Sequence, residues 1–330
     1  MLSPAGRTSR SLVLALLATG LVAGGCGSEE AEEAPTGDAA APDAAQFPKP
    51  DGRSLEEIAG QEGTESDLVI LPAGQVFHEG ENRIGLGVFT IDRKPVADAD
   101  IALYVAKPNK PAEGPFPAAV ESLAVEAPFQ SRSTSLDPDA AESVYTANID
   151  LEGKGEWRIL ALVKDGDGFG FTAVPSAVVG AFPKVPAEGE DAPVIETLTE
   201  DDVGGDLAKI DTRQPPSTMH EANFAGVVGE KPIVLLFATP ALCSSRVCGP
   251  VVDIAEQVKA ERGDEAEFIM QEIYKDNEFD KGLREQVEAY NLPSEPWLFV
   301  IDSDGMISTA IEGAFSEGEL NAALDEVTGS

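Results

Sequence analysis

The sequence has little positive charge. Its 330 residues include 23 Lys and Arg against 59 Asp and Glu, so the formal net charge is −36 at pH 7. Nucleic-acid binding requires a basic surface, and so does electrostatic docking on anionic lipid headgroups. The composition therefore argues against nucleic acid as a partner. We interpret the acidity as a property that keeps the protein soluble.

Cysteine and histidine are also scarce, with three and two residues. Cys26 follows an apolar N-terminal run, whereas Cys243 and Cys248 stand close together. One single cysteine and one pair predict a processed N-terminal cysteine and one dithiol. The two histidines are His78 and His220. We interpret His78, near the start of a predicted strand, as a structural residue.

The apolar run at residues 12–22 is shorter than the about 20 apolar residues that a membrane-spanning helix needs. Two arginines precede the run and small residues follow it, which predicts a secretory signal over residues 1–25. The small residues before Cys26 resemble the bacterial lipobox. That resemblance implies that Cys26 is lipidated and holds the protein at the extracytoplasmic face of the cell membrane.

Residues 26–67 are rich in Ala, Pro, Gly and acidic residues. Such a segment buries too little apolar surface to fold, and its like charges extend it. We therefore predict a disordered acidic tether between the membrane and the folded part.

Residues 68–182 show short apolar alternations, as at Ile101, Leu103 and Val105, separated by Gly-, Asp- and Pro-rich turns. Several short strands at this spacing predict an antiparallel β-sandwich. The pattern resembles immunoglobulin-like modules of exported bacterial proteins. We interpret residues 165–168, DGDG, as a hairpin turn, because Phe169 occupies the next alternate position of a calcium loop. The predicted strands cover residues 83–91, 100–106, 143–151, 156–164 and 168–174.

Residues 183–218 are rich in Pro and acidic residues, and we interpret them as a linker and the start of the next domain. Residues 219–330 alternate strand-like apolar runs with helical stripes of apolar residues, which predicts an α/β fold. Ser316 and Glu319 form a capping-box pair before the last helix. The predicted strands cover residues 233–237, 267–273, 297–302 and 306–312, and the predicted helices cover residues 219–228, 251–260, 281–290 and 316–327.

The cysteine pair follows the first of these strands, and Pro296 stands directly before the third. This arrangement resembles the thioredoxin superfamily, and residues 189–193, GEDAP, resemble the opening of redoxin-type domains. The resemblance covers about residues 189–327. It implies a thioredoxin-like fold in which Pro296 is cis, faces the cysteines and shapes the substrate groove.

The cysteine motif departs from the usual Cys-x-x-Cys, because four residues separate Cys243 from Cys248. The run at residues 248–251, CGPV, looks like a CGPC motif whose second cysteine has become valine. A disulfide between the two cysteines requires Cys243 to lie in the turn, with the helix starting near Pro250. Many thioredoxins have a buried acid near this strand, where the present chain has Leu235 and Leu236.

The resemblance implies thiol–disulfide exchange with thiols or disulfides of exported proteins, without an organic cofactor. The CGP context favours Cys248 as the attacking thiol and Cys243 as the resolving one. We expect the helix N-terminus and Arg246 to lower the pKa of the attacking thiol.

Two alternatives stay open. The pair could form a permanent structural disulfide in a non-catalytic binding lipoprotein, although closing so short a loop stabilises a fold by only about 2 kcal/mol. The chain could also handle copper, since thiolate and imidazole suit Cu(I). However, His220 precedes the first strand, whereas copper-delivery relatives place their histidine in a late loop. Peroxidase chemistry is disfavoured, because four positions, not three, separate Thr239 from Cys243.

Overall fold

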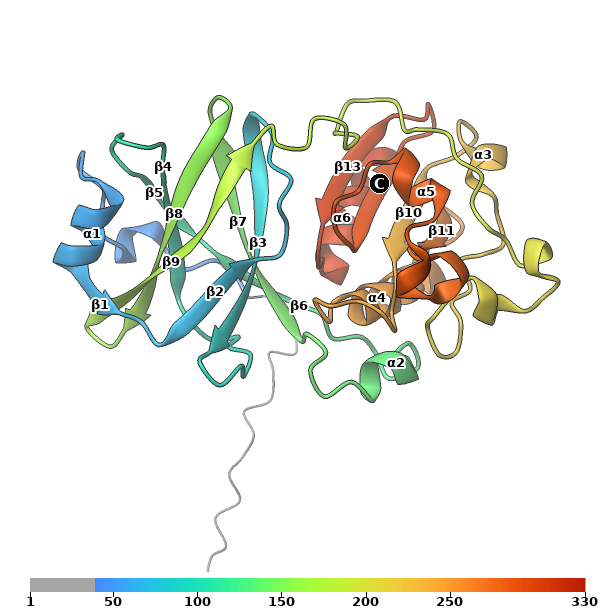
Figure 1. Ribbon diagram of the computed structural model, residues 1–330, viewed down its shortest axis with the longest axis horizontal. Coiled ribbons are helices and arrows are strands. Elements are labelled where there is room, and N and C mark those ends of the chain that lie inside the picture. The colour runs from blue at the N-terminus through green and yellow to red at the C-terminus, as the bar shows by residue number, and fades with distance from the viewer. Residues whose placement is uncertain (1–38, 330) are drawn as a thin grey trace, which may run out of the picture. The chain divides into compact units, whose positions relative to one another are not determined.

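The chain consists of mixed sheets with few helices. A computed structural model describes residues 39–329 (Figure 1). The predicted signal at residues 1–25, the lipidation site Cys26 and the beginning of the predicted tether lie outside the described residues. Within the described part, no helix has the length and apolar character needed to cross a membrane.

The first half of the described chain forms two sheets, with strand orders β1-β9-β8-β4-β5 and β2-β3-β7-β6. Their neighbouring strands are antiparallel, except that β1 runs parallel to β9. The strands are β1 (Gly63–Glu65), β2 (Leu68–Pro72), β3 (Gly80–Thr90), β4 (Ile101–Ala106), β5 (Glu113–Pro117), β6 (Ala119–Ser122), β7 (Ser143–Leu151), β8 (Gly155–Asp165) and β9 (Gly168–Val179).

One apolar cluster receives side chains from both sheets. Ile84 and Leu86 of β3 share it with Ile101, Leu103 and Val105 of β4. Alternate residues of a strand point to opposite faces, so the period-two pattern places one face of each sheet in this core. The five strands predicted in this region are confirmed, as is the turn between β8 and β9. The short strands β1, β2, β5 and β6 were not predicted.

Part of the predicted tether is ordered and packed. A 3₁₀ helix, η1 (Ala44–Gln46), is followed by helix α1 (Leu55–Glu62), which begins with a capping box between Ser54 and Glu57. Leu55 and Ile58 are buried against a cluster that includes Tyr104 of β4. The prediction of a disordered segment up to residue 67 is therefore wrong from residue 43 onward. Composition did not reveal that one sheet has a second apolar face, which α1 covers.

A third sheet has the order β11-β10-β12-β13, with β10 parallel to β11 and the other pairs antiparallel. All side chains of β10 are buried, because each face of the sheet has its own core. Val234 and Leu236 pack in the cluster that contains α4 and α6, whereas Leu235 and Phe237 pack in the opposite cluster. The strands are β10 (Ile233–Ala238), β11 (Glu267–Glu272), β12 (Trp297–Ile301) and β13 (Ile307–Glu312).

The predicted helices are present, but two are short. The first spans four residues instead of ten, and the third spans five. The last helix has the predicted capping box, in which Ser316 and Glu319 each accept from the other's backbone N–H. The helices are α2 (Arg132–Ser135), α3 (Phe224–Val227), α4 (Cys248–Arg262), α5 (Glu285–Ala289) and α6 (Glu317–Thr328), with 3₁₀ helices η2 (Asp201–Val203), η3 (Leu207–Lys209), η4 (Lys275–Asn277) and η5 (Phe279–Lys281).

The described residues belong to one compact unit, and hydrogen bonds join the first two sheets to the third. Glu312 of β13 accepts hydrogen bonds from the backbone N–H groups of Gln75 and Val76, each 2.8 Å long. Arg83 of β3 donates to the carbonyl oxygen of Ala314 over 2.8 Å. Residues 183–218, predicted as a linker, pack against the third sheet and bury Asp211 among others. The sequence pattern of each half did not reveal these cross-contacts.

Candidate active site

Both cysteines lie where β10 passes into α4. The strand ends at Ala238, residues 239–247 form turns, and Cys248 is the first residue of the helix. The backbone N–H of Cys243 donates to the carbonyl oxygen of Thr239 over 3.1 Å, which fixes the start of the turn. The helix begins at Cys248, two residues before the predicted start at Pro250. Both cysteines are free thiols in this structure, so the disulfide between them stays a prediction.

The Cys243 thiol is 6% exposed and surrounded by hydrogen-bond donors. The Cys248 thiol donates to it and lowers the pKa of Cys243 to about 6, assisted by Ser245 and by the backbone N–H groups of Cys248 and Val247 against the effect of burial. Ser245 Oγ lies 3.2 Å from Cys243 Sγ. Donors of this kind stabilise a thiolate, because the first turn of a helix has unpaired N–H groups. Cys243 therefore has the ionised sulfur of the pair.

The Cys248 thiol is fully buried. Burial raises its pKa well above the ordinary range, and the neighbouring Cys243 sulfur raises it further. An attacking thiol must be ionised and reachable. The small difference in exposure and the directions of the two pKa shifts favour Cys243 as the attacking residue and Cys248 as the resolving one, the opposite of the sequence-based prediction. The CGP motif indicated the helix start correctly but contained no information about burial.

Arg246, which was predicted to lower the pKa of the attacking thiol, forms an ion pair with an acid. Its guanidinium lies 3.0 Å from the carboxylate of Asp137, and about half of its side chain is exposed. The hydrogen bonds that lower the pKa of Cys243 come from Cys248, Ser245 and the backbone, not from this cation. The left-handed backbone of Arg246, with φ of 62°, belongs to the turn that joins the two cysteines.

Pro296 has the cis peptide bond that the resemblance implied, in this case between Glu295 and Pro296. The preceding acid was not predicted as part of the site. Burial, together with the negative charges of Cys243 and Glu272, raises the pKa of Glu295 to about 7. The charge of Glu295 also acts on Cys248. The signal available in the sequence was its position directly before Pro296.

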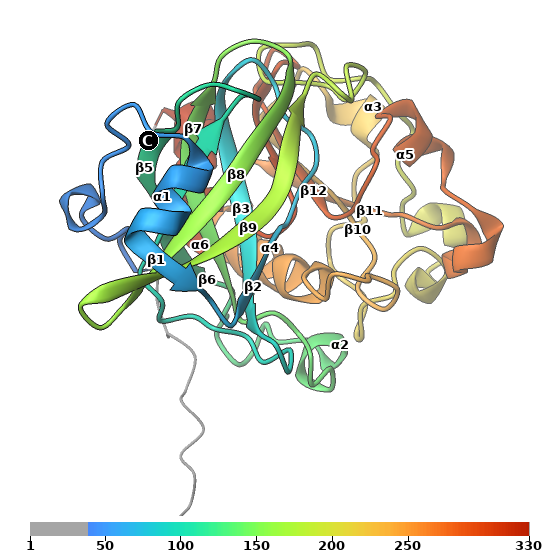
Figure 2. The same ribbon diagram turned by 60° about the vertical axis from the view of Figure 1, so that its left-hand side comes forward.

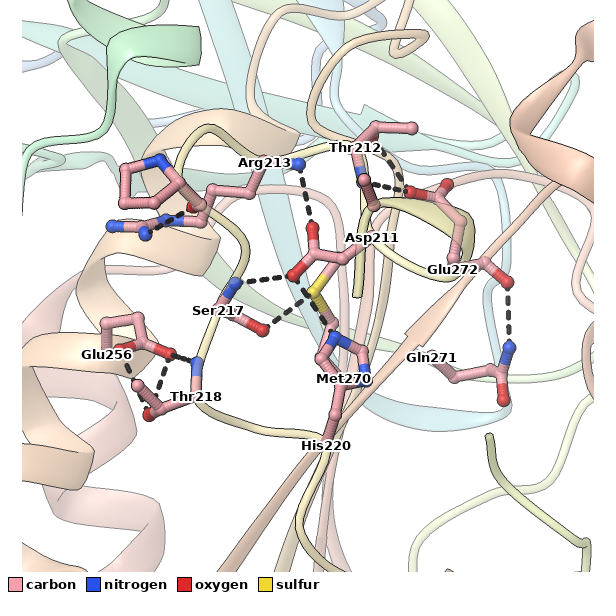
Figure 3. A network of polar contacts seen from close by, with 12 residues as sticks. Asp211, Thr212, Arg213, Ser217, Thr218, His220, Glu256, Met270, Gln271 and Glu272 are labelled. Atoms are coloured by element: carbon pink, nitrogen blue, oxygen red, sulfur yellow. Dashed lines mark hydrogen bonds and ion pairs between the residues drawn. The ribbon is translucent and has the colours of Figure 1, made fainter. Parts of the chain in front are cut away.

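A buried acid lies at the end of β11. Glu272 pairs in register with Ala238 of β10, the residue after which the cysteine turn begins. Its carboxylate accepts from the backbone N–H and hydroxyl of Thr212 over 3.0 and 2.8 Å, as Figure 3 shows. Burial raises the pKa of Glu272 to about 7. A buried acid was expected near β10, where the chain has Leu235 and Leu236, but Glu272 lies on the neighbouring strand, at the end of an apolar run.

His220 is part of a buried network next to this acid (Figure 3). Its Nε2 lies 3.1 Å from the Asp211 carboxylate, which also accepts from the backbone N–H groups of Arg213 and Ser217 over 2.7 and 2.6 Å. His78 lies in the first half of the chain, where its backbone N–H donates to Asn82. Across residues 39–329 no group of three or more His, Cys, Asp or Glu has an arrangement that could hold a metal ion.

Comparisons with known proteins give matches among solved structures. No family model matches the chain, and no curated protein matches it. Among the solved structures that match is the crystal structure of a thiol:disulfide interchange protein, thioredoxin family protein, from Chlorobium tepidum TLS. It shares 18% sequence identity and covers 43% of this chain and 98% of its own, with a TM-score of 0.30. We therefore base the function on the geometry of this chain.

Proposed function

We propose that this chain is a thiol–disulfide oxidoreductase that acts through Cys243 and Cys248. The observation that supports the proposal is a contacting pair of thiols with opposite pKa shifts at the start of α4. One sulfur is ionised near neutral pH, and the other remains protonated and protected until it is needed. A permanent structural bridge requires neither property.

The exchange proceeds in two steps. The Cys243 thiolate attacks a substrate disulfide, forms a mixed disulfide and releases one substrate sulfur, which takes up a proton. The Cys248 thiol then loses its proton and attacks the Cys243 sulfur, so that the protein disulfide closes and the second substrate thiol leaves. The substrate gains two electrons and two protons. The protein gives up the two electrons and the Cys248 proton, and solvent supplies the other proton, because Cys243 reacts as a thiolate. The reverse sequence forms a disulfide in the substrate.

The second step needs an acceptor for the Cys248 proton. Glu295 is suited to this role, because its charge interacts with both cysteines and its pKa is raised to about 7. A group whose pKa lies close to the working pH accepts and returns protons efficiently. Glu272 contributes a second buried acid at the same end of the sheet.

The proposal includes the architecture and the cellular setting. In it, the first two sheets are an immunoglobulin-like β-sandwich and residues 183–329 are a thioredoxin-like α/β fold with Pro296 beside the dithiol. A lipid on Cys26 anchors the protein to the outer face of the cell membrane. The substrates are thiols or disulfides of exported proteins. The supports are the resemblances in the sequence and the strand order of the third sheet.

The first test is the reduction potential of the Cys243–Cys248 couple, measured by equilibration in glutathione or dithiothreitol buffers. A potential between about −120 and −270 mV is typical of exchange catalysts and is the expected result. A potential well below about −300 mV indicates a structural disulfide and contradicts the proposal.

Two serine variants test the roles of the cysteines. Cys248→Ser should accumulate mixed disulfides with a model substrate, because Cys243 attacks and nothing resolves the product. Cys243→Ser should form none and should lower the rate of insulin reduction by at least about 10³-fold, as expected for loss of a nucleophile. Cys26→Ser is the matched control, with an unchanged rate. Trapping by Cys243→Ser instead of Cys248→Ser would reverse the assignment.

A further inference from the structure

Residues 123–142, which connect β6 to β7, form a strap that lies beside the cysteine site. The strap begins and ends in the first two sheets and contains the short helix α2. Figures 1 and 2 both show α2 beside α4, the helix that begins with Cys248. The sequence assigned this segment to the predicted β-sandwich and gave it no function.

Buried polar contacts anchor the middle of the strap. Asp253 of α4, which is fully buried, accepts a hydrogen bond from the backbone N–H of Ser131 over 3.0 Å. The same carboxylate pairs with Arg213, whose guanidinium also donates to the carbonyl oxygen of Phe129 over 2.7 Å. Leaving any of these charges unpaired inside the protein costs several kcal/mol. The middle of the strap, at residues 129–131, is therefore held firmly on α4.

The far end of the strap holds the cysteine turn through a weaker pair of contacts. Asp137 forms the ion pair with Arg246, and the backbone N–H of Ala141 donates to the carbonyl oxygen of Arg246 over 3.1 Å. Ala141 also packs against the apolar cluster that contains both cysteines. The side chains of the ion pair are 51% and 21% exposed, so this contact can open at low cost.

The strap approaches α4 closely at the residue after Cys248. A Cβ atom on Gly249 would lie 2.8 Å from Oγ1 of Thr134. Real side chains do not come so close, so a side chain at position 249 displaces the strap or Thr134. The strap thus touches both Arg246 and Gly249, the residues on either side of Val247 and Cys248.

We propose that the strap controls which disulfides reach Cys243, by holding the cysteine turn closed until the Asp137–Arg246 contact opens. Only 6% of the Cys243 residue is exposed, so the approach to its sulfur is narrow, and a disulfide within a folded protein needs a wider approach than a small reagent does. Residues 123–142 are then a specificity-determining element for the proposed exchange reaction. The role of the strap in selecting substrates rests on the proposed function, whereas the test below measures thiol labelling and does not require that function.

The test measures access to Cys243 by reagents of two sizes. The full chain with Cys26→Ser and Cys248→Ser has Cys243 as its single thiol. Its rate constants are measured with N-ethylmaleimide and with a maleimide attached to a small folded protein, and their ratio is compared with that of the urea-unfolded chain. The ratio of the rate constant of the large reagent to that of N-ethylmaleimide should be at least tenfold lower in the folded chain than in the unfolded chain. Equal ratios would overturn the proposal.

Asp137→Asn and Arg246→Gln should each raise the ratio in favour of the large reagent by about two- to fivefold, the range for a partly exposed ion pair. The double variant should show no larger effect, because either substitution already breaks the contact. The matched control is Asp139→Asn on the same strap, where the side chain forms no hydrogen bond or ion pair within residues 39–329. Equal ratios in all four variants contradict the proposal.

A second pair of variants does not depend on the ion pair. Gly249→Ala should raise the ratio about fivefold or more, because the added methyl group displaces the strap. Adding Thr134→Ala should reverse the effect by removing the clashing hydroxyl. Circular dichroism establishes that each variant is folded. Labelling needs only a thiol, so failure of this test leaves the reduction potential as an independent test of the exchange reaction.

Discussion

The two parts of the described chain differ in what they bury. Between residues 63 and 179 the buried polar side chains are Asn82, Ser122 and Ser131, and the last of these belongs to the strap. Between residues 183 and 329, five Asp, Glu, Arg and His residues are buried. These are Asp211, Arg213, His220, Asp253 and Glu272.

This difference indicates which part of the fold accommodates buried ionisable groups. Burying apolar side chains stabilises a sheet without the free-energy cost of burying polar groups, which lose hydration. A buried acid with a raised pKa is a candidate functional residue. In this protein such an acid, Glu272, lies at the end of β10, where the cysteine turn begins. The first two sheets contribute to that site through the strap and through Val144 of β7, which packs in the cluster that contains both cysteines.

The largest difference in stability between the two parts should come from the buried ion pair of Asp253 and Arg213, within residues 183–329. Asp253→Asn leaves Arg213 charged and without its partner, so we expect the free energy of unfolding to fall by about 3–5 kcal/mol in urea titrations. The matched control is the exposed pair of Lys94 and Asp92 in the first part, where Asp92→Asn should cause no measurable change. Similar losses at both sites would remove the contrast.

Glu272 should make the second part sensitive to pH. Its folded pKa of about 7 lies above the unfolded value of 4.5, so the folded state binds the extra proton and stability falls as pH rises between these values. The shift corresponds to about 3 kcal/mol. Glu272→Gln should be more stable than the parent at pH 8 and lose this part of the pH dependence in urea titrations. Glu65→Gln, on the exposed strand β1, is the control. Parallel pH profiles for the parent and Glu272→Gln would contradict this prediction.

The pH dependence of Cys243 alkylation tests the hydrogen bonds in the turn. With Cys26→Ser as background, the rate should rise through a midpoint near pH 6, because the thiolate reacts and its pKa is about 6. Ser245→Ala should raise the midpoint by about one unit, as expected for loss of a hydrogen bond to a charged group. The matched control is Ser244→Ala in the same exposed turn. A midpoint near 8.5 in the parent would mean that the sulfur is unperturbed.

The smallest effect should come from Arg246. Because its guanidinium is paired with Asp137, Arg246→Gln should move the alkylation midpoint of Cys243 by less than about 0.3 unit with a small reagent. The same variant should still change access for the large reagent. An upward shift as large as that of Ser245→Ala would restore the sequence-based role of Arg246 as an activating cation.

Periodicity and turn residues predicted most of the strands and the dithiol that follows β10, since these are local properties of the chain. The short strands were missed because strands such as β1 and β6 are defined by their partners more than by their own residues. Residues 54–59 were compatible with a helical turn, but the packing of α1 was missed, because Leu55 and Ile58 are buried only against the face of the sheet that they cover.

For the site itself, the sequence determined that two cysteines lie between a strand and a helix and that a proline precedes the third strand. The tertiary structure decided the surroundings of each thiol. Cys248 is buried within the core, whereas hydrogen-bond donors surround Cys243, and the pKa values of the two thiols therefore shift in opposite directions. It also brought Glu272 and residues 123–142 to the site from distant positions in the chain. Burial and charge interactions act between neighbours in space, and those neighbours exist only once the sheets have packed.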